Sequence, residues 1–200
     1  MRVAVLVSGN GTNLQALLDA GPPIEVVLVG CNRADAAAIG RASASSVRVC
    51  LADRHDVPRR TERQLALLDA IVKAGAELVV LAGFDEILLP DFVVRFNGRM
   101  INTHPSLLPA FGGTLHAVEQ ALDHGVKVTG CTVHLVTDEL DNGPILLQGC
   151  VEVRDDDNVA SLHARILEQE HRLLCAAVRA FAEGRVRVQG HRAHVIGSTR

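Results

Sequence analysis

The sequence lacks the features of a disulfide-stabilised, metal-binding or nucleic-acid-binding chain. Its five cysteines are Cys31, Cys50, Cys131, Cys150 and Cys175. They form no C-x-x-C pair and stand in apolar stretches, so we expect reduced, buried cysteines rather than disulfides or a zinc site. The net charge is only −3, and lysine and arginine are scattered rather than massed. Nucleic acid is therefore not an expected partner, and any anion site must be local.

Long apolar runs and linkers are also missing. No run approaches membrane-spanning length, so no membrane association is expected. The apolar stretch 2–7 lacks the cationic region and cleavage site of a signal peptide, so it is interpreted as a strand of a cytoplasmic protein. Repeats and Pro-, Gly- or Ser-rich linkers are absent. With 200 residues, 48% of them apolar, the chain is predicted to form a single domain over residues 1–200.

Short β-branched runs alternate with helical stretches in the first half of the chain. Buried strands are predicted at residues 2–7, 24–31, 47–52 and 77–84. Helices are predicted at residues 13–20, 34–44 and 59–75. The alternation indicates an α/β fold with an open, mostly parallel, doubly wound sheet and helices on both faces.

After the segment GRMINTH, which includes a fifth strand, the pattern changes. Two strand-like runs, 126–137 and 143–153, are separated only by DELDNG and are expected to pair as an antiparallel edge of the sheet. Residues 158–184 form the longest predicted helix, with Gly184 as its stop. Residues 191–200 carry no signal that we can interpret. Because ligands of open α/β sheets bind beyond the carboxyl ends of the strands, functional residues are expected in the segments that follow the strands.

The motif SGNGTNL, residues 8–14, directly follows the first strand. Gly9 and Gly11 would let the backbone approach a ligand, and Thr12 or Asn13 can cap the following helix. A helix N-terminus attracts anions, so phosphate is the natural guest, although a glycine-rich turn without a ligand fits the spacing nearly as well. The motif is neither a dinucleotide fingerprint nor a P-loop, because the third glycine and the G-K-[ST] ending are missing.

The segment INTHPSLLP, residues 101–109, also lies at the end of a predicted strand. Asn102 and His104 stand two residues apart, so on an extended segment both side chains share one face, and Pro105 disfavours helix at His104. An amide beside an imidazole can stabilise an oxyanion and move a proton in acyl-type transfer. Each residue is, however, more often a turn former or a solvated group in a loop.

The segment DELDNG carries three carboxylates, Asp138, Glu139 and Asp141. By themselves they fit the polar tip of a hairpin. An acid close to His104 would instead favour the charged form of that imidazole.

Five segments together resemble the glycinamide ribonucleotide formyltransferases, a family of folate-dependent enzymes of purine synthesis. They are SGNGTNLQALLDA, VVLAGF, INTHPSLLPAF, TVHLVTDELDNGPILLQ and QEH. The likeness runs with nearly constant spacing from Val3 to about Gly184. The asparagine, the histidine and the acid of D-x-G-P are typical of formyltransferases in general, and SGNGTN is typical of this family. The fold implied is the formyltransferase-type α/β sheet.

The resemblance implies two small-molecule partners, glycinamide ribonucleotide and the co-substrate 10-formyltetrahydrofolate, and no metal. The phosphate of the ribonucleotide would sit at Gly11, Thr12 and Asn13, with Asn10 nearby. Glu170, from QEH, would bind the ribose hydroxyls, although a helix-surface carboxylate is the ordinary interpretation of that position. The N-terminal half would bind phosphate, and the C-terminal half would bind folate and carry out the chemistry.

The same resemblance predicts a folate site. The pterin would lie along four residues, contacted partly through their backbone, namely Asp85, Glu86, Ile87 and Leu88. Asn102 and loop 138–143 would also contact the folate, and Arg60 would meet its glutamate tail. Related chains commonly carry a Met-Arg pair where this chain has Asp85 and Glu86. The two acids would weaken binding of a polyanionic tail unless they point away.

The catalytic residues implied are Asn102, His104 and Asp141. The amide and the protonated imidazole would donate hydrogen bonds to the oxyanion of a tetrahedral intermediate. Asp141 would keep His104 cationic and help to remove the proton of the attacking amine. No covalent intermediate is expected, because no Ser or Cys stands in a suitable context.

Three other functions would account for part of the sequence pattern. A 10-formyltetrahydrofolate hydrolase would use the same trio with water in place of the amine, but would not need SGNGTN or Glu170. A methionyl-tRNA formyltransferase would need an RNA-binding domain and a basic surface. A non-catalytic nucleotide-binding module would leave NTHPSLLP and LDNGP unexplained. The oligomeric state is expected to be monomer or homodimer.

Overall fold

The computed structural model describes residues 1–197. It divides into two compact units, Met1–Ile101 and Asn102–Arg200. The expectation of one domain over residues 1–200, with phosphate binding in one half and folate binding and catalysis in the other, stays a prediction.

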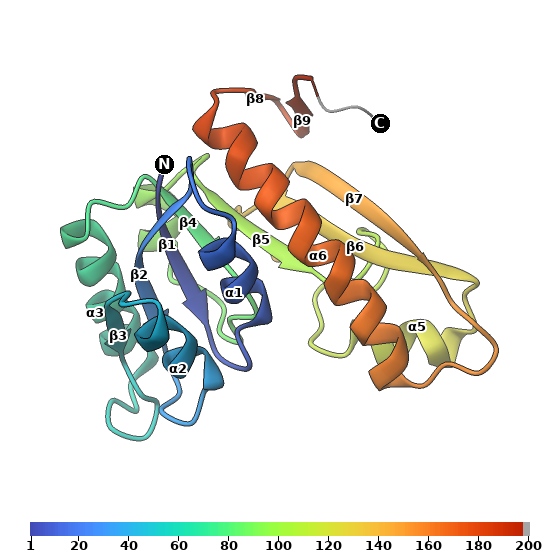
Figure 1. Cartoon of the computed structure of the whole chain (residues 1–200), viewed down its shortest axis with the longest axis horizontal. Coiled ribbons are helices and arrows are strands. Elements are labelled where there is room, and N and C mark those ends of the chain that lie inside the picture. Colours follow the sequence, from blue (N-terminus) through green and yellow to red (C-terminus); the bar gives the residue numbers. More distant parts are fainter. Residues whose placement is uncertain (198–200) are drawn as a thin grey trace. The chain divides into compact units, whose positions relative to one another are not determined.

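Strands and helices alternate throughout the first unit (Figure 1). Its strands are β1 (Arg2–Val7), β2 (Glu25–Cys31), β3 (Val49–Leu51) and β4 (Leu78–Leu81). Its helices are α1 (Thr12–Asp19), α2 (Ala37–Ala44), α3 (Arg60–Lys73) and α4 (Pro90–Arg95).

The second unit combines an antiparallel pair with the longest helix of the chain. Its strands are β5 (Met100–His104), which begins in the first unit, β6 (Val128–Leu135), β7 (Ile145–Glu152), β8 (Val186–Gln189) and β9 (Arg192–Val195). Its helices are α5 (Ala117–His124) and α6 (Val159–Ala182).

The strands form a seven-stranded sheet in the order β3-β2-β1-β4-β5-β6-β7 and a separate two-stranded sheet, β8-β9. β1 pairs in parallel with β2 and with β4, and β2 pairs in parallel with β3. β6 and β7 pair antiparallel, with Val128 opposite Glu152 and His134 opposite Ile145. The predicted α/β fold with a mostly parallel sheet and an antiparallel edge is therefore confirmed.

Parallel strands become buried on both faces when helices cover them, and the first unit follows this rule. Five consecutive residues of β1, Val3–Val7, are buried, as is the whole of β4. Gly30 of β2 shows how closely helix α3 packs on the sheet. A β-carbon at this position would lie 2.5 Å from Leu6 Cδ2 and 3.1 Å from Leu67 Cδ2, so no larger residue fits without displacing its neighbours.

Helix α6 supplies the core of the second unit by packing against β6 and β7 (Figure 1). Its buried apolar residues recur at helical spacing; they include Leu162, Ile166, Leu173, Leu174, Ala177 and Val178. The helix begins with a reciprocal capping box. Asn158 Oδ1 accepts from the Ser161 N–H at 3.0 Å, and Ser161 Oγ accepts from the Asn158 N–H at 3.0 Å.

Three features were not predicted. Helices α4 and α5 are six and eight residues long, and α4 spans fewer than two helical turns. Strand β9 of the hairpin β8-β9 falls in the segment 191–200 that carried no interpretable pattern, whereas β8 precedes that segment, and residues 198–200 lie outside the described part. Both strands alternate between apolar and polar residues, VRVQ and RAHV, but each is only four residues long.

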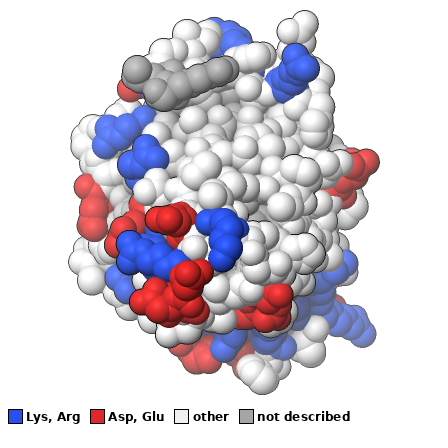
Figure 2. All heavy atoms as spheres, turned by 90° about the vertical axis from the view of Figure 1, so that its right-hand side faces the viewer, with Lys and Arg blue, Asp and Glu red and all other residues white. Residues whose placement is uncertain are grey.

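The surface agrees with the scattered charges of the sequence. On the face shown in Figure 2, positive and negative side chains are interspersed, and a broad area without charged side chains adjoins them. Among residues 1–197, no helix has both the length and the apolar character needed to cross a bilayer.

We predict that the capping box of α6 contributes measurably to stability. Asn158→Ala and Ser161→Ala should each lower the free energy of unfolding by about 1 kcal/mol. The double variant should lose less than the sum, because the two residues satisfy each other. Urea denaturation measures the three values.

Asp155→Ala is the control, because it removes an exposed ion pair with Lys127 in the same region and should cost less than about 0.5 kcal/mol. Fully additive losses for Asn158→Ala and Ser161→Ala would contradict the reciprocal arrangement.

Candidate functional site

The second unit brings Asn102, His104 and Asp141 together. Asn102 and His104 lie on β5, where extended backbone places their side chains on one face. Asp141 lies in the loop between β6 and β7. Asn102 Nδ2 is 3.4 Å from Asp141 Oδ1, and His104 Nδ1 is 3.5 Å from Asp141 Oδ2. Asp141 is therefore not an exposed hairpin tip, since only 8% of its side chain is exposed.

His104 has an acceptor at each ring nitrogen. Its Nε2 is 2.9 Å from the carbonyl oxygen of Phe111, which can only accept, so Nε2 carries a proton. Its Nδ1 faces the Asp141 carboxylate. A neutral ring would leave a bare nitrogen against that carboxylate, so the surroundings are fully satisfied only by the charged imidazolium.

His134 is a member of the cluster that the sequence analysis missed. It lies on β6, only 2% exposed, with Nδ1 2.9 Å from the Leu135 carbonyl oxygen. Since that carbonyl can only accept, Nδ1 carries the proton of the neutral ring and Nε2 is an acceptor. Asn102 Nδ2 donates to this Nε2 at 3.1 Å.

This arrangement determines which way the Asn102 amide faces. Its nitrogen points at two acceptors, His134 Nε2 and Asp141 Oδ1, so the amide oxygen must point elsewhere. His134 could have been noticed in the motif TVHLVT, because it places an imidazole in a strand that is buried over nearly its whole length. Its partners, however, are 32 residues earlier and 7 residues later in the chain, and sequence alone does not pair them.

The charge of Asp141 is stabilised by its neighbours. Burial alone would raise the pKa of Asp141, but contacts that include the N–H of Gly113 and the charge of His104 outweigh it, so the pKa is lowered. Gly113 N donates to Oδ2 at 2.8 Å. Asp141 also has a left-handed backbone, φ 52°, a conformation that Asp tolerates better than most residues. The loop therefore holds an ionised carboxylate in a defined place.

The segment after His104 is held from the neighbouring strands. Thr132 Oγ1 donates to the Ser106 carbonyl at 2.7 Å and accepts from the Leu108 N–H at 3.0 Å. Gln148 Nε2 donates to the Leu108 carbonyl at 2.9 Å. These bonds fix the chain that carries Phe111, the partner of His104.

In the first unit, the turn SGNGTNL joins β1 to α1. Gly11 is the N-cap of α1, without a side-chain capping bond, so the expectation that Thr12 or Asn13 caps the helix is wrong. Gly11 has φ +71°, which glycine adopts at little cost. A β-carbon there would lie 2.7 Å from Ala38 Cβ, so helix α2 fills the space. Glycine is required for this close packing as well as for its backbone conformation.

Helix α2 also holds the outer part of the turn. Arg41 Nε donates to the Asn10 carbonyl at 2.8 Å, and the Ala38 N–H donates to the Gly9 carbonyl at 3.2 Å. The first-turn N–H groups of α1 have no partners within the helix, as at any helix start. The turn is thus a rigid entry into a helix whose positive end can face an anion.

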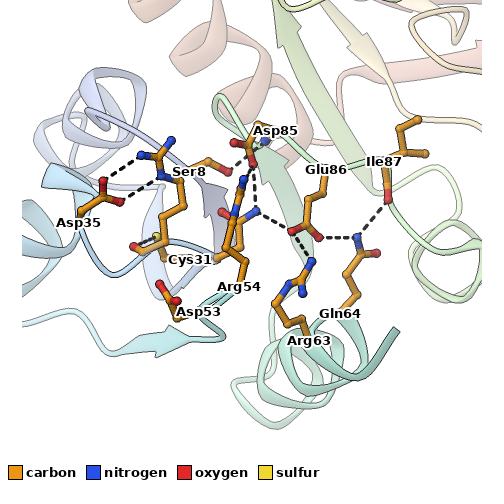
Figure 3. A network of polar contacts seen from close by, with 12 residues as sticks. Ser8, Cys31, Asp35, Asp53, Arg54, Arg63, Gln64, Asp85, Glu86 and Ile87 are labelled. Carbon is orange, nitrogen blue, oxygen red and sulfur yellow. Dashed lines mark hydrogen bonds and ion pairs between the residues drawn. The ribbon is translucent and has the colours of Figure 1, made fainter. Parts of the chain in front are cut away.

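The segment Asp85–Leu88 follows β4, and its two acids point into the first unit (Figure 3). Asn32 Nδ2 donates to Asp85 Oδ1 at 2.9 Å and to Glu86 Oε1 at 3.0 Å. Arg54 pairs with Asp85 at 2.6 Å, and Arg63 pairs with Glu86 at 2.8 Å. Each carboxylate is therefore matched by an arginine of the same unit.

The two carboxylates are ionised as a result. Burial would raise the pKa values of Asp85 and Glu86, but hydrogen bonds from Asn32 and Gln64 and the two arginines outweigh it and lower both pKa values. The departure from the common Met-Arg pair thus leaves no unpaired negative charge at this segment.

The remaining predicted residues lie as follows. Arg60 is the first residue of α3 and is exposed; within residues 1–197 it makes no ion pair, whereas its neighbour Arg59 pairs with Glu62 at 3.0 Å. Glu170 is buried on α6, 3% exposed, so the interpretation as a helix-surface carboxylate is excluded. Its charge, together with burial as the larger cause, raises the pKa of the Cys131 thiol to about 12.

The cysteines and the possible metal-ligating side chains lie as follows. All five cysteines are free, but Cys150 is exposed on β7, so the expectation that all of them are buried is wrong. In the part of the chain that the structure describes, no group of three or more His, Cys, Asp or Glu side chains is arranged to hold a metal ion.

The chain is similar in sequence to proteins that are named as formyltransferases. Residues 1–178 match the sequence profile of the formyl transferase family. The phosphoribosylglycinamide formyltransferase of Mycobacterium tuberculosis is 48% identical over 195 residues, covering 96% of this chain and 90% of the relative. The enzyme of the same name from Escherichia coli is 39% identical over 203 residues, covering 98% of this chain and 94% of the relative.

Solved structures agree with this similarity. Glycinamide ribonucleotide transformylase 1 from Symbiobacterium toebii matches with a TM-score of 0.93 and 45% identity, covering 98% of this chain and 93% of that one. A formyltetrahydrofolate deformylase from Pseudomonas syringae matches with a TM-score of 0.89 and 27% identity, covering 97% of this chain but 65% of that one. With its profile match, its relatives and its fold in agreement, the chain belongs to the formyl transferase family.

Proposed function

We propose that this chain transfers the formyl group of 10-formyltetrahydrofolate to the free amine of glycinamide ribonucleotide, a step of purine synthesis. The convergence of Asn102 and His104 on the buried carboxylate of Asp141 carries the proposal. The names of the relatives, phosphoribosylglycinamide formyltransferase and glycinamide ribonucleotide transformylase, support the choice of substrates. A cytoplasmic location and a monomeric or homodimeric state belong to the same proposal.

The ribonucleotide would be bound through its phosphate and its ribose. Asn10, Gly11, Thr12 and Asn13 would hold the phosphate, because the turn leads into the positive end of α1. Glu170 would accept hydrogen bonds from the ribose hydroxyls. Its burial supports this role over that of a solvated carboxylate on the helix surface.

The folate would be bound through the backbone of Asp85–Leu88. Within residues 1–197, the N–H groups of Glu86, Ile87 and Leu88 have no protein partner, although the side chains of the two acids are fully engaged. A pterin ring presents alternating donors and acceptors that such backbone groups can match. Arg60 would meet the glutamate tail, because its charge is not engaged in an ion pair within the described residues.

The chemistry follows from the cluster in the second unit. The amine attacks the formyl carbon on N10 of the folate, and negative charge develops on the formyl oxygen. Asn102 Nδ2 lies 3.4 Å and His104 Nδ1 lies 3.5 Å from an oxygen of Asp141. Both distances exceed that of an ordinary hydrogen bond, so the contacts of these two nitrogens with Asp141 are weak. These N–H groups can therefore turn to the oxyanion at small cost. Such a donor typically contributes about 3 to 4 kcal/mol to the transition state.

Proton movement completes the transfer. Asp141, ionised because its pKa is lowered, takes the proton of the attacking amine, directly or through a water. The intermediate collapses by breaking the bond between the formyl carbon and N10, and protonated His104 supplies the proton for the departing nitrogen. His134 would act as a positioning residue, because its Nε2 accepts from the Asn102 amide and orients it.

Hydrolysis of the formyl folate is the second candidate function. It is supported by the structural similarity to a formyltetrahydrofolate deformylase. The same cluster could activate water instead of an amine. The two functions differ in one measurable respect: a transferase consumes the formyl donor only when the ribonucleotide is present.

We predict that Asp141→Asn lowers kcat by about 100- to 10,000-fold, because the amide cannot take a proton. The fold should persist, since Asn has nearly the same shape and also tolerates a left-handed backbone. Steady-state kinetics with both substrates measures the effect. Asp123→Asn, an exposed residue of α5 in the same unit, is the control and should retain full activity. Equal rates for the two variants would remove Asp141 from the mechanism.

A second prediction concerns stability and pH. Because the pKa of Asp141 is lower in the folded chain than in the unfolded chain, its charge stabilises the fold above the unfolded pKa of about 3.9. This stabilisation is lost as the pH falls through the folded pKa. The difference in unfolding free energy between the wild type and Asp141→Asn should therefore shrink from about pH 5 to about pH 3. Denaturation at several pH values tests it, and a growing difference would contradict the lowered pKa.

A third prediction separates transfer from hydrolysis. Gly11→Ala places a β-carbon against Ala38 and strains a positive φ, so the turn must shift. The KM for the ribonucleotide should rise about tenfold, equal to about 1.4 kcal/mol, while the KM for the formyl folate stays nearly unchanged. Inorganic phosphate should compete with the ribonucleotide in the wild type.

Gly40→Ala is the matched control, because the space around Gly40 is open and it lies on helix α2. Consumption of the formyl donor at full rate without any amine, unchanged in Gly11→Ala, would establish the hydrolase instead.

A further inference from the structure

Gln64 of helix α3 is a fully buried amide with three contacts to the segment after β4 (Figure 3). Its Nε2 donates to Glu86 Oε2 at 3.0 Å and to the Ile87 carbonyl at 3.0 Å. Its Oε1 accepts from the Leu89 N–H at 2.7 Å. One side chain thus uses its donors and its acceptor on three of the four consecutive residues 86–89.

These contacts determine which backbone groups of residues 86–89 face helix α3. The Ile87 carbonyl and the Leu89 N–H are turned inward, toward α3, whereas the Ile87 side chain is 61% exposed. The Leu88 N–H, which has no protein partner within residues 1–197, lies between these two fixed points, and the likewise unpartnered Ile87 N–H lies between the contacts at Glu86 and at the Ile87 carbonyl. Their direction is therefore set by Gln64, since short stretches of backbone pinned at both ends have little freedom.

Further bonds hold the start of the segment. The Asp85 N–H donates to Ser8 Oγ at 3.0 Å, and Arg63, one residue before Gln64, pairs with Glu86. The side chains of Arg63 and Glu86 are only 7% and 10% exposed, so their charges are well shielded from water. Neither bond reaches residues 87–89, and Gln64 is the contact that extends the restraint to them.

We propose that Gln64 is a positioning residue for the formyl folate. It holds the backbone of residues 86–88 in the binding arrangement before the ligand arrives, so that ordering the segment does not weaken binding. The inference rests on the proposed function only in taking this segment as the folate contact. Gln64 contacts the side of residues 86–89 that faces helix α3, and it has no part in the chemical step.

The test is Gln64→Met, which keeps the length of the side chain and removes its donors and acceptor. The KM for the formyl folate should rise about tenfold, as should the Kd for a deaza folate analogue measured by calorimetry. The kcat at saturating folate and the KM for the ribonucleotide should stay within about twofold. A general loss of structure would change all four values together.

Ile71→Val is the matched control, because Ile71 is fully buried on the same helix, and the change removes one methyl group without touching residues 86–89. It should lower Tm while leaving the KM for folate unchanged. If Gln64→Met and Ile71→Val affect folate binding equally at matched loss of Tm, the positioning role is overturned.

Gln64→Glu gives a second, independent measurement. A carboxylate at this position keeps the acceptor for Leu89 but faces Glu86 and the Ile87 carbonyl, so folate binding should weaken more than in Gln64→Met. An equal or smaller effect would contradict the proposal. Wild-type protein without transfer activity would refute the proposed function, whereas active wild type with unaltered folate affinity in both Gln64 variants would refute this inference alone.

Discussion

A buried carboxylate must be surrounded by donors and positive charge, and both units of this protein are organised by that constraint. In the second unit, Asp141 receives the Gly113 N–H and faces His104, His134 and the Asn102 amide. These contacts compensate for the burial of a loop carboxylate that is only 8% exposed and has a left-handed backbone. The chemistry we propose uses the same charge, since a carboxylate that stays ionised is also a base.

The first unit meets the constraint in a different way. Asp85 and Glu86 are matched by Arg54 and Arg63, with Asn32 between them. Removing one partner of such a network is costly, because it leaves the other charge buried without compensation. Here the network serves shape rather than reactivity: it draws two side chains inward, while the N–H groups of Glu86, Ile87 and Leu88 have no protein partner within residues 1–197. Acidic residues next to the proposed site for an anionic ligand are thereby made compatible with it.

Glycine has a related function in the turn after β1. Gly11 is needed because its backbone is left-handed and because Ala38 lies where a β-carbon would be. The sequence pattern suggested that glycine brings the backbone close to a ligand. The structure adds that glycine first brings the backbone close to helix α2, which makes the turn rigid. A rigid turn at the start of a helix orients its N–H groups without help from a capping side chain.

What the sequence by itself determined is local. Alternating apolar runs predicted the strands and the helices α1, α2 and α3 of the first unit, the antiparallel pair β6 and β7, and the longest helix, because periodicity and turn residues act within a few positions. The spacing of Asn102 and His104 placed them on one face for the same reason. Helix α4 was missed because its six residues span fewer than two turns, and α5 was missed although it is as long as α1 and α2.

Only the tertiary structure decided which polar groups meet. His134 contacts Asn102 from 32 residues away, and Gln64 contacts Ile87 from 23 residues away. No pattern within either segment identifies the partner, because a buried donor seeks any acceptor that the fold brings near it. The direction of the Asn102 amide and the inward turn of Asp85 and Glu86 depend on such contacts between distant segments. These contacts exist only after the strands and helices have packed.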